Sequence, residues 1–143
     1  FTGNDAFAGL TLQAYDSKHG EIFEDFGQVQ NTGYMISIAD ANVDAGAGAS
    51  QNAGYRNLFY PGDSYCNPQT SVDVLAMPVG GPWCKIPDAI RYAIEVKPKK
   101  AFPVHDSTLR PDRIGSCHSA PAQYLPLHGI EFIAMKEGDE VEF

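Results

Sequence analysis

The sequence is poor in three kinds of feature, and each shortage excludes a class of protein. Ten Lys and Arg are outnumbered by eighteen Asp and Glu, which gives a net charge of -8. So few cations argue against a nucleic-acid partner, because phosphate binding needs clustered Lys and Arg. No apolar run approaches the roughly 20 residues of a membrane helix. The three cysteines have unrelated spacings, which argues against a disulfide framework and predicts a reducing, cytoplasmic location.

The chain also lacks the short motifs that reveal a metal site by themselves, since no HxH, HExxH or CxxC occurs. Any metal centre must therefore be assembled from residues far apart in the sequence. With 143 residues, the chain is long enough for one domain with a sizeable core and too short for two. We expect a single domain over residues 1–143.

Two apolar segments end in turns that place distinctive side chains after a strand. Leu58–Tyr60 is stopped by Pro61-Gly62, and Asp63 is the first side chain after the break. Val72–Val79 is continuous enough to be a buried strand, and the Gly-Gly-Pro turn after it leads to Trp83, the only tryptophan. Both segments predict strands with functional loops at their carboxyl ends.

A helix and a further strand follow. Residues 86–97 carry apolar side chains three or four positions apart, with Pro87 near the start and Lys97-Pro98 at the end, which predicts a helix. Ala101–Val104 then predicts a strand that leads directly into His105 and Asp106. Earlier in the chain, Leu10–Tyr15 predicts a strand that runs toward His19.

The remaining segments complete an α+β pattern with few helices. Gly33–Ile38 predicts an antiparallel partner for Leu58–Tyr60, and Ile130–Met135 predicts a final strand. The Gly- and Ala-rich stretch from Asp40 to Arg56 is expected to be an exposed insertion, with a substrate-shaping flap as the alternative. Pro111–Pro126 is expected to be irregular.

His19, Asp63 and His105 share one property, which is that each follows a predicted strand. Loops from neighbouring strands converge at the carboxyl ends of strands, so these side chains can meet there. Imidazole and carboxylate are the usual ligands of zinc and similar ions. Taken singly, each residue also has a structural explanation: Asp63 could cap a turn, His19 could lie in a surface loop, and His105 could donate a hydrogen bond to Asp106.

Several motifs occur in a characteristic order between Leu10 and Pro111, namely Asn31–Tyr34, Leu58–Ser64, Val72–Trp83, Lys97-Pro98 and Phe102–Asp106. Together they resemble the C-terminal portion of the metallo-beta-lactamase superfamily, and in particular its branch of zinc-dependent hydrolases similar to ascorbate-6-phosphate lactonase. The resemblance implies half of an αββα sandwich with a mixed sheet. It also implies a two-metal site at the sheet edge, with zinc or alternatively manganese, and hydrolysis by a metal-activated hydroxide.

The same resemblance assigns roles to three residues, and the positions of two further residues in the sequence suggest supporting roles. His19 matches the third metal histidine of the family, Asp63 matches the aspartate that bridges the two metals, and His105 matches the last histidine. Asp63 is thereby the candidate catalytic residue, because a carboxylate shared by two cations fixes their separation. Asp106 is a candidate for orienting the adjacent ligand, and Trp83 is a candidate for lining the pocket.

One family motif has no counterpart here. Family members carry HxHxDH in the N-terminal half of the sandwich, and nothing in this sequence matches it. His118 and His128 follow the last family motif and are expected to be surface or structural residues. Three protein ligands do not complete two metal spheres, so we expect a missing N-terminal half. The exposed apolar sheet face of a half-sandwich predicts a homo-oligomer or another partner.

These observations predict a metal-dependent hydrolase that acts on an ester, lactone or phosphoester-like bond of a small molecule. The missing ligands put the activity of this chain alone in question. The alternative is a non-catalytic oligomeric interaction module that has lost the N-terminal metal ligands, whose assembly would be insensitive to a chelator. A third hypothesis is a small-molecule binding domain that uses the loop from Gly80 to Trp83 and the flap from Asp40 to Arg56. Only the tryptophan supports it, and a tryptophan in a loop is more often a packing residue.

Overall fold

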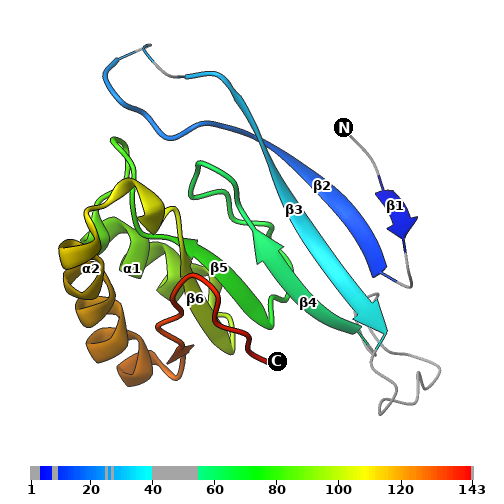
Figure 1. Ribbon diagram of the computed structural model, residues 1–143. Helices are drawn as coiled ribbons and strands as arrows, with labels where there is room; N and C mark the ends of the chain where they lie inside the picture. The colour runs from blue at the N-terminus through cyan, green and yellow to red at the C-terminus, as the bar shows by residue number, and fades with distance from the viewer. Residues whose placement is uncertain (1–3, 8–9, 25, 27, 40–54, 143) are drawn as a thin grey trace.

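The computed structural model describes residues 4–7, 10–24, 26, 28–39 and 55–142. In this part of the chain, seven strands form one mixed sheet whose spatial order is the order of the sequence (Figure 1). β1 to β4 pair antiparallel, and β4 to β7 pair parallel. The elements are β1 (Asn4–Phe7), β2 (Leu10–Lys18), β3 (Gln30–Ala39), β4 (Tyr55–Tyr60), β5 (Val74–Pro78), α1 (Ile86–Val96), β6 (Lys100–Val104), η1 (Asp106–Thr108), α2 (Pro111–Tyr124), η2 (Leu125–His128) and β7 (Glu131–Phe132).

The antiparallel half confirms the expected pairing of β3 with β4, in which Tyr34 lies opposite Tyr60. β2 is longer than predicted and ends at Lys18, so His19 follows the strand directly. Residues 40–54, which make up most of the expected insertion, lie outside the described residues, whereas Tyr55 and Arg56 belong to β4.

The parallel half is built around β5, whose five residues are all buried. The predicted helix is confirmed as α1, which connects β5 to β6 and begins with a proline in its first turn. Its last turn ends at Lys97, which has φ 55° and donates its peptide N–H to the Ala93 carbonyl at 2.9 Å. A left-handed residue at this position ends a helix and satisfies one of its free carbonyls.

The expectation of an irregular segment over Pro111–Pro126 is wrong, because these residues form α2 and the start of η2. The less exposed residues of α2 recur three or four positions apart, as on one face of a helix, and they are Ile114, Cys117, His118 and Pro121. Of these, His118 and Pro121 are buried. A histidine and a proline do not count as apolar positions in a periodicity argument, and an internal proline normally argues against a helix.

The predicted strand over Ile130–Met135 shortens to the two residues of β7. Ile133 still donates its peptide N–H to the Ala101 carbonyl at 2.9 Å. The next position along β6 is Pro103, which has no N–H to continue the ladder.

Two adjacent rows of residues across the sheet show how its sides differ. The helix-side row packs in the core that includes Ala89, Tyr92 and Ala93 of α1. Its members are Met35, Phe59, Leu75 and Ala101, which are buried, and Phe132, which is partly buried. The opposite row points to the other side of the sheet, and its members are Ile36, Leu58, Val74, Lys100 and Glu131. Ile36 and Leu58 are only half-buried.

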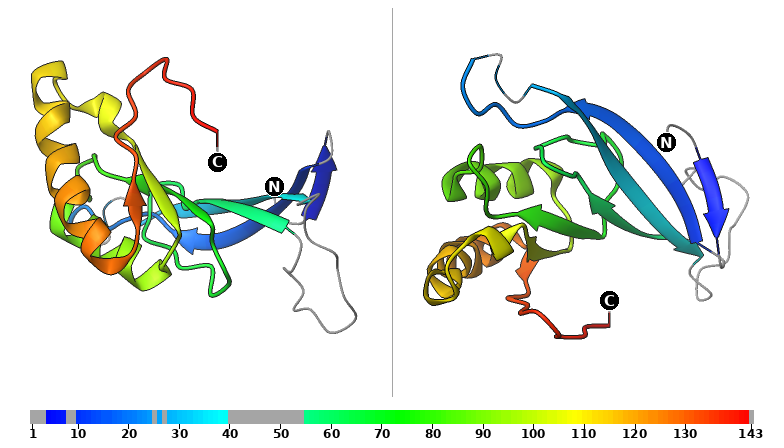
Figure 2. Two further views of the ribbon diagram at one scale, coloured as in Figure 1. Left: turned by 90° about the horizontal axis from the view of Figure 1, so that it is seen from below. Right: turned by 45° about the horizontal axis from the view of Figure 1, so that its top comes forward.

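Figure 2 shows α1 and α2 together beside β5 and β6, while β1, β2 and β3 extend to the far end of the sheet. None of the helices in the described ranges has the length and apolar character needed to cross a membrane.

Candidate metal centre

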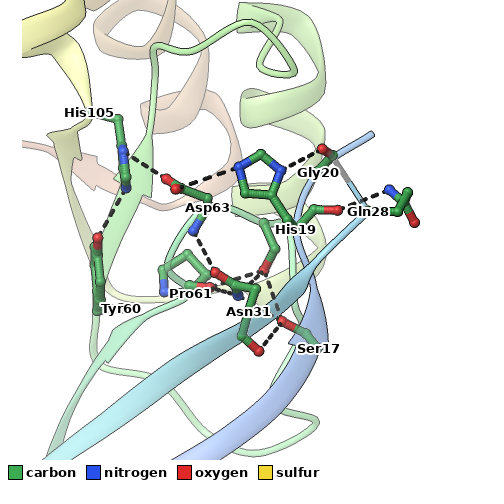
Figure 3. A network of polar contacts seen from close by, with 10 residues as sticks. Ser17, His19, Gly20, Gln28, Asn31, Tyr60, Pro61, Asp63 and His105 are labelled. Carbon is green, nitrogen blue, oxygen red and sulfur yellow. Dashed lines mark hydrogen bonds and ion pairs between the residues drawn. The ribbon is translucent and has the colours of Figure 1, made fainter. Parts of the chain in front are cut away.

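The structure brings the three predicted ligands together around one carboxylate. Asp63 follows the turn after β4, His19 follows β2, and His105 follows β6. His19 Nε2 is 3.6 Å from Asp63 Oδ2, and His105 Nδ1 is 3.0 Å from Asp63 Oδ1. Figure 3 shows the two imidazoles on either side of the carboxylate. Segments separated by more than forty residues in sequence therefore meet at one edge of the sheet.

Asp63 is held by Asn31, a residue of β3 to which the sequence assigned no role. The Asn31 amide oxygen accepts the Asp63 peptide N–H at 2.9 Å, and its amide nitrogen donates to the Pro61 carbonyl at 2.8 Å. Between them, Gly62 has φ 69°, and a Cβ at this position would overlap the Asn31 side chain. Only glycine combines this backbone conformation with such a close approach.

The Asn31 amide also belongs to a small polar network beneath the site. Its nitrogen donates to Ser17 Oγ at 2.8 Å and lies 3.1 Å from Ser64 Oγ, and the two hydroxyls are 3.3 Å apart. Ser64 is 3% exposed. Buried hydroxyls of this kind keep their position only when their hydrogen bonds are satisfied, so the network makes the Asp63 turn rigid. The only sequence signal for Asn31 was its place in the motif Asn31–Tyr34.

His19 has one ring nitrogen engaged by the backbone. Nδ1 lies 2.7 Å from the carbonyl oxygen of Gly20, and a carbonyl can only accept, so Nδ1 carries a proton. The Gly20 peptide N–H donates to the Asp63 carbonyl at 2.7 Å, which couples the two loops. The indole of Trp83 lies against the imidazole of His19, with ring centroids 6.0 Å apart and planes at 69°.

His105 has both ring nitrogens engaged and an unusual backbone. Its φ is 66° and its ψ 13°, a left-handed conformation that is uncommon for a residue other than glycine. Nε2 lies 3.1 Å from the hydroxyl of Tyr60, and the two rings are stacked with an interplanar angle of 3°. Tyr60 was not predicted as a site residue, and only its position as the last residue of β4 could have indicated it.

The Tyr60 phenol is kept protonated by its surroundings. Burial raises its pKa, and the nearby Asp63 carboxylate raises that pKa further. A neutral phenol donates its O–H to His105 Nε2, and the proton on the imidazole is then left on Nδ1, where it faces the carboxylate.

The other two predicted site residues lie beside this cluster. Trp83 contacts His19, as described, and the ring of Tyr65, with centroids 5.0 Å apart. The Asp106 carboxylate pairs with His118, whose Nε2 lies 2.9 Å from Asp106 Oδ2. His118 was expected to be either a surface or a structural residue. It is 7% exposed and is therefore structural. His128 is exposed at the end of η2.

The donor set fits parts of two metal spheres and completes neither. Since His19 is protonated on Nδ1, its neutral Nε2 is an acceptor that faces another acceptor, Asp63 Oδ2. Two facing acceptors are held together by a cation, either a proton or a metal ion. His105 instead donates its Nδ1–H to the other oxygen of Asp63 at 3.0 Å. It would have to release that proton to act as a ligand, and each imidazole would then share Asp63 with a different ion. Within the described residues, no three His, Cys, Asp or Glu side chains are arranged to hold one metal ion together.

Comparisons with known proteins agree with the fold. No protein-family model matches the chain. It is 32% identical over 108 residues to the protein Rv0786c of Mycobacterium tuberculosis, an alignment that covers 76% of this chain and 45% of that protein. Its structure is similar to Igni18, a metallo hydrolase from Ignicoccus hospitalis, with a TM-score of 0.61 and 17% identity over 99% of this chain and 58% of the other. A Parabacteroides distasonis protein classed as a metal-dependent hydrolase matches with a TM-score of 0.59 and 15% identity, over 93% of this chain and 55% of the other.

The chain thus has an α+β fold with a mixed sheet that matches about half of these metallohydrolase chains, as the half-sandwich prediction required. It spans 45% of the length of the mycobacterial relative. At this identity, the structural likeness concerns the fold alone.

Proposed function

We propose that this chain is the C-terminal part of a metal-dependent hydrolase of the metallo-beta-lactamase type. The observation that carries the proposal is the convergence of His19 and His105 on different oxygens of the Asp63 carboxylate. This is the arrangement expected of a carboxylate that bridges two cations. Because zinc commonly takes four ligands, each ion would need further ligands from the N-terminal half of the sandwich.

The substrate is proposed to be a small molecule with an ester, lactone or phosphoester-like bond, as in the branch similar to ascorbate-6-phosphate lactonase. Zinc is the proposed metal, with manganese as the alternative, because the ligands combine imidazole and carboxylate. When bound, such an ion lowers the pKa of a water ligand so that hydroxide is available near neutral pH.

The residues of this chain would position and polarise the reacting groups. The Nδ1–H of His19 is tied to the Gly20 carbonyl, which leaves Nε2 as the ligand atom. Asn31 holds the backbone of Asp63 and so fixes where its two oxygens point. Tyr60 keeps its proton and can donate a hydrogen bond beside His105. The ring of Trp83 covers His19 on one side and would exclude water there.

The test compares two aspartates in the full-length protein. Asp63→Asn keeps the size of the side chain but removes the negative charge that two cations would share. We expect it to lose at least one bound metal per chain by elemental analysis and to lose lactone or ester hydrolysis by more than about a hundred-fold. The matched control is Asp88→Asn, which alters an exposed carboxylate paired with Arg91 in α1. Full metal content and turnover in Asp63→Asn would refute the proposal.

Two proposals about the surroundings accompany this function. The half-buried apolar residues of the opposite row would be covered by the N-terminal half or by a second copy of the chain. The cytoplasm is the proposed location, and it is supported by the three cysteines, Cys66, Cys84 and Cys117, all of which are free.

A further inference from the structure

A buried histidine–carboxylate contact lies behind His105, outside the cluster of proposed ligands. His118 of α2 is 7% exposed, and its Nε2 lies 2.9 Å from Asp106 Oδ2. The ring of Phe132 packs edge-on against His118, with centroids 6.1 Å apart. The His118 ring is buried and needs this hydrogen bond, because an unpaired ring N–H would lose its hydration without compensation. The Asp106 side chain is 26% exposed. The contact ties the turn after β6 to the middle of α2.

That turn sets the backbone of His105. Asp106 is the residue after His105 and the first residue of η1. The left-handed conformation of His105 is unfavourable for a residue other than glycine, so neighbouring groups must impose it. Two of them act on its carbonyl: Thr108 Oγ1 donates to it at 3.1 Å, and Gly80 approaches it so closely that a Cβ would overlap the oxygen. The pair of Asp106 and His118 restrains the other side of the same turn.

The direction of the imidazole follows from this backbone conformation. With φ 66° and ψ 13°, the ring reaches Asp63 through Nδ1 and Tyr60 through Nε2. If the turn relaxed to an ordinary right-handed conformation, the Cα–Cβ bond would point elsewhere and both contacts would be lost. Through its contact with Asp106, α2 can therefore decide where a site residue points.

We propose that His118 and Asp106 form a positioning pair that holds His105 in its left-handed conformation and aims its imidazole at Asp63. Neither residue touches the reacting groups, so both act through His105. The consequence for metal binding rests on the proposed function, whereas the effect on the imidazole itself does not.

The experiment measures the tautomer of His105 in the full-length, metal-free protein at one fixed pH by ring-nitrogen NMR. In the natural protein, we expect one tautomer with the proton on Nδ1. His118→Phe keeps a ring in the core but removes the bond to Asp106, and we expect it to give a mixture of both His105 tautomers. His118→Gln offers an amide N–H in place of the ring N–H and should restore the single tautomer. His128→Phe is the matched control, because His128 is exposed, and it should change nothing.

A second readout uses Zn²⁺ titration of the same proteins. We expect His118→Phe to weaken zinc binding by about ten-fold or more, the size of effect typical for groups that orient a ligand, and His128→Phe to leave it unchanged. If His118→Phe does not fold, Asp106→Ala provides both readouts, because alanine leaves no oxygen to accept the His118 N–H. A variant that loses the pair yet keeps the natural tautomer would overturn the inference. Absence of zinc binding by the natural protein would instead count against the proposed function, and the tautomer result would still decide the inference.

Discussion

The two sides of the sheet differ in what covers them. On the helix-side row, Phe59, Leu75 and Ala101 are fully buried in one core with residues of α1 and η2. On the opposite row, Ile36 and Leu58 are half-buried, and Ile38, two positions along β3 on the same side, is 50% exposed. One side therefore has its packing partner within this chain. The other side presents apolar surface of the kind that a further layer would bury.

The candidate metal centre belongs to the less covered side. Tyr60 is two residues after Leu58 in β4, so its side chain points to the same side as the opposite row. Asp63 follows three residues later, and its side chain is 43% exposed. The candidate site thus opens on the side of the sheet that lies away from the helix-side core.

The largest expected effect on stability comes from a substitution in the helix-side row. Leu75→Ala should reduce the free energy of unfolding by about 2–5 kcal/mol, because a fully buried leucine leaves a cavity between β5 and α1. Leu58→Ala, the same change on the half-buried opposite row, should cost only about 1 kcal/mol. Urea unfolding of both variants measures the difference, and equal losses would mean that the two sides are equally packed.

A smaller effect concerns the tyrosine that joins α1 to the core on the helix side. The Tyr92 hydroxyl donates to the Cys66 carbonyl at 2.6 Å, and Tyr92→Phe should cost about 1 kcal/mol at pH 7. Burial raises the pKa of Tyr92 above its ordinary value near 10. Above about pH 10 the unfolded chain loses this proton while the folded chain keeps it, so stability falls as pH rises.

Unfolding curves measured between pH 7 and pH 11 test the sign of this effect. We expect Tyr92→Phe to show a shallower fall in the free energy of unfolding above pH 10 than the natural protein. The remaining slope would include contributions from other groups whose pKa values burial also raises, namely Tyr15, Tyr60, Tyr65, Cys66 and Cys84. An identical slope in the variant would show that Tyr92 is not protected from solvent.

The smallest effect on stability is expected on the opposite side. Ile38→Lys should change the free energy of unfolding by less than about 0.5 kcal/mol, because the side chain is 50% exposed. If a second copy covers this side, the same substitution should abolish the dimer in sedimentation. Thr11→Lys, an exposed change on β2 that faces the helix side, is the control. Association that survives Ile38→Lys would place the contact elsewhere or leave this side to the N-terminal half.

Much of the fold could be predicted from local patterns. The apolar run of β5, the spacing of α1 and the break at Pro61-Gly62 are each contained in a few consecutive residues. α2 could not be predicted this way, because its core-facing residues include His118 and Pro121. His118 is held in place by its contacts with Asp106, twelve residues earlier, and with Phe132 of β7, fourteen residues later.

The candidate site also contains residues that could be predicted from the sequence and residues that could not. His19, Asp63 and His105 could be named because each follows a strand, and the structure places them together, although their role as metal ligands stays a prediction. Asn31 and Tyr60 could not be named, because their roles are defined only by atoms that they contact across the sheet. The register of the strands depends on the whole sheet. It places Tyr34 opposite Tyr60 and so decides which residues of β3 lie beside the end of β4.

The sequence by itself determined that the central strands and α1 form and which donor residues follow the strands, since those features depend on propensity and spacing along a short stretch of chain. Only the tertiary structure decided which oxygen of Asp63 each imidazole faces, and that His118 lies behind His105. Such relations depend on backbone conformation and packing between segments far apart in the chain, and no local pattern encodes them.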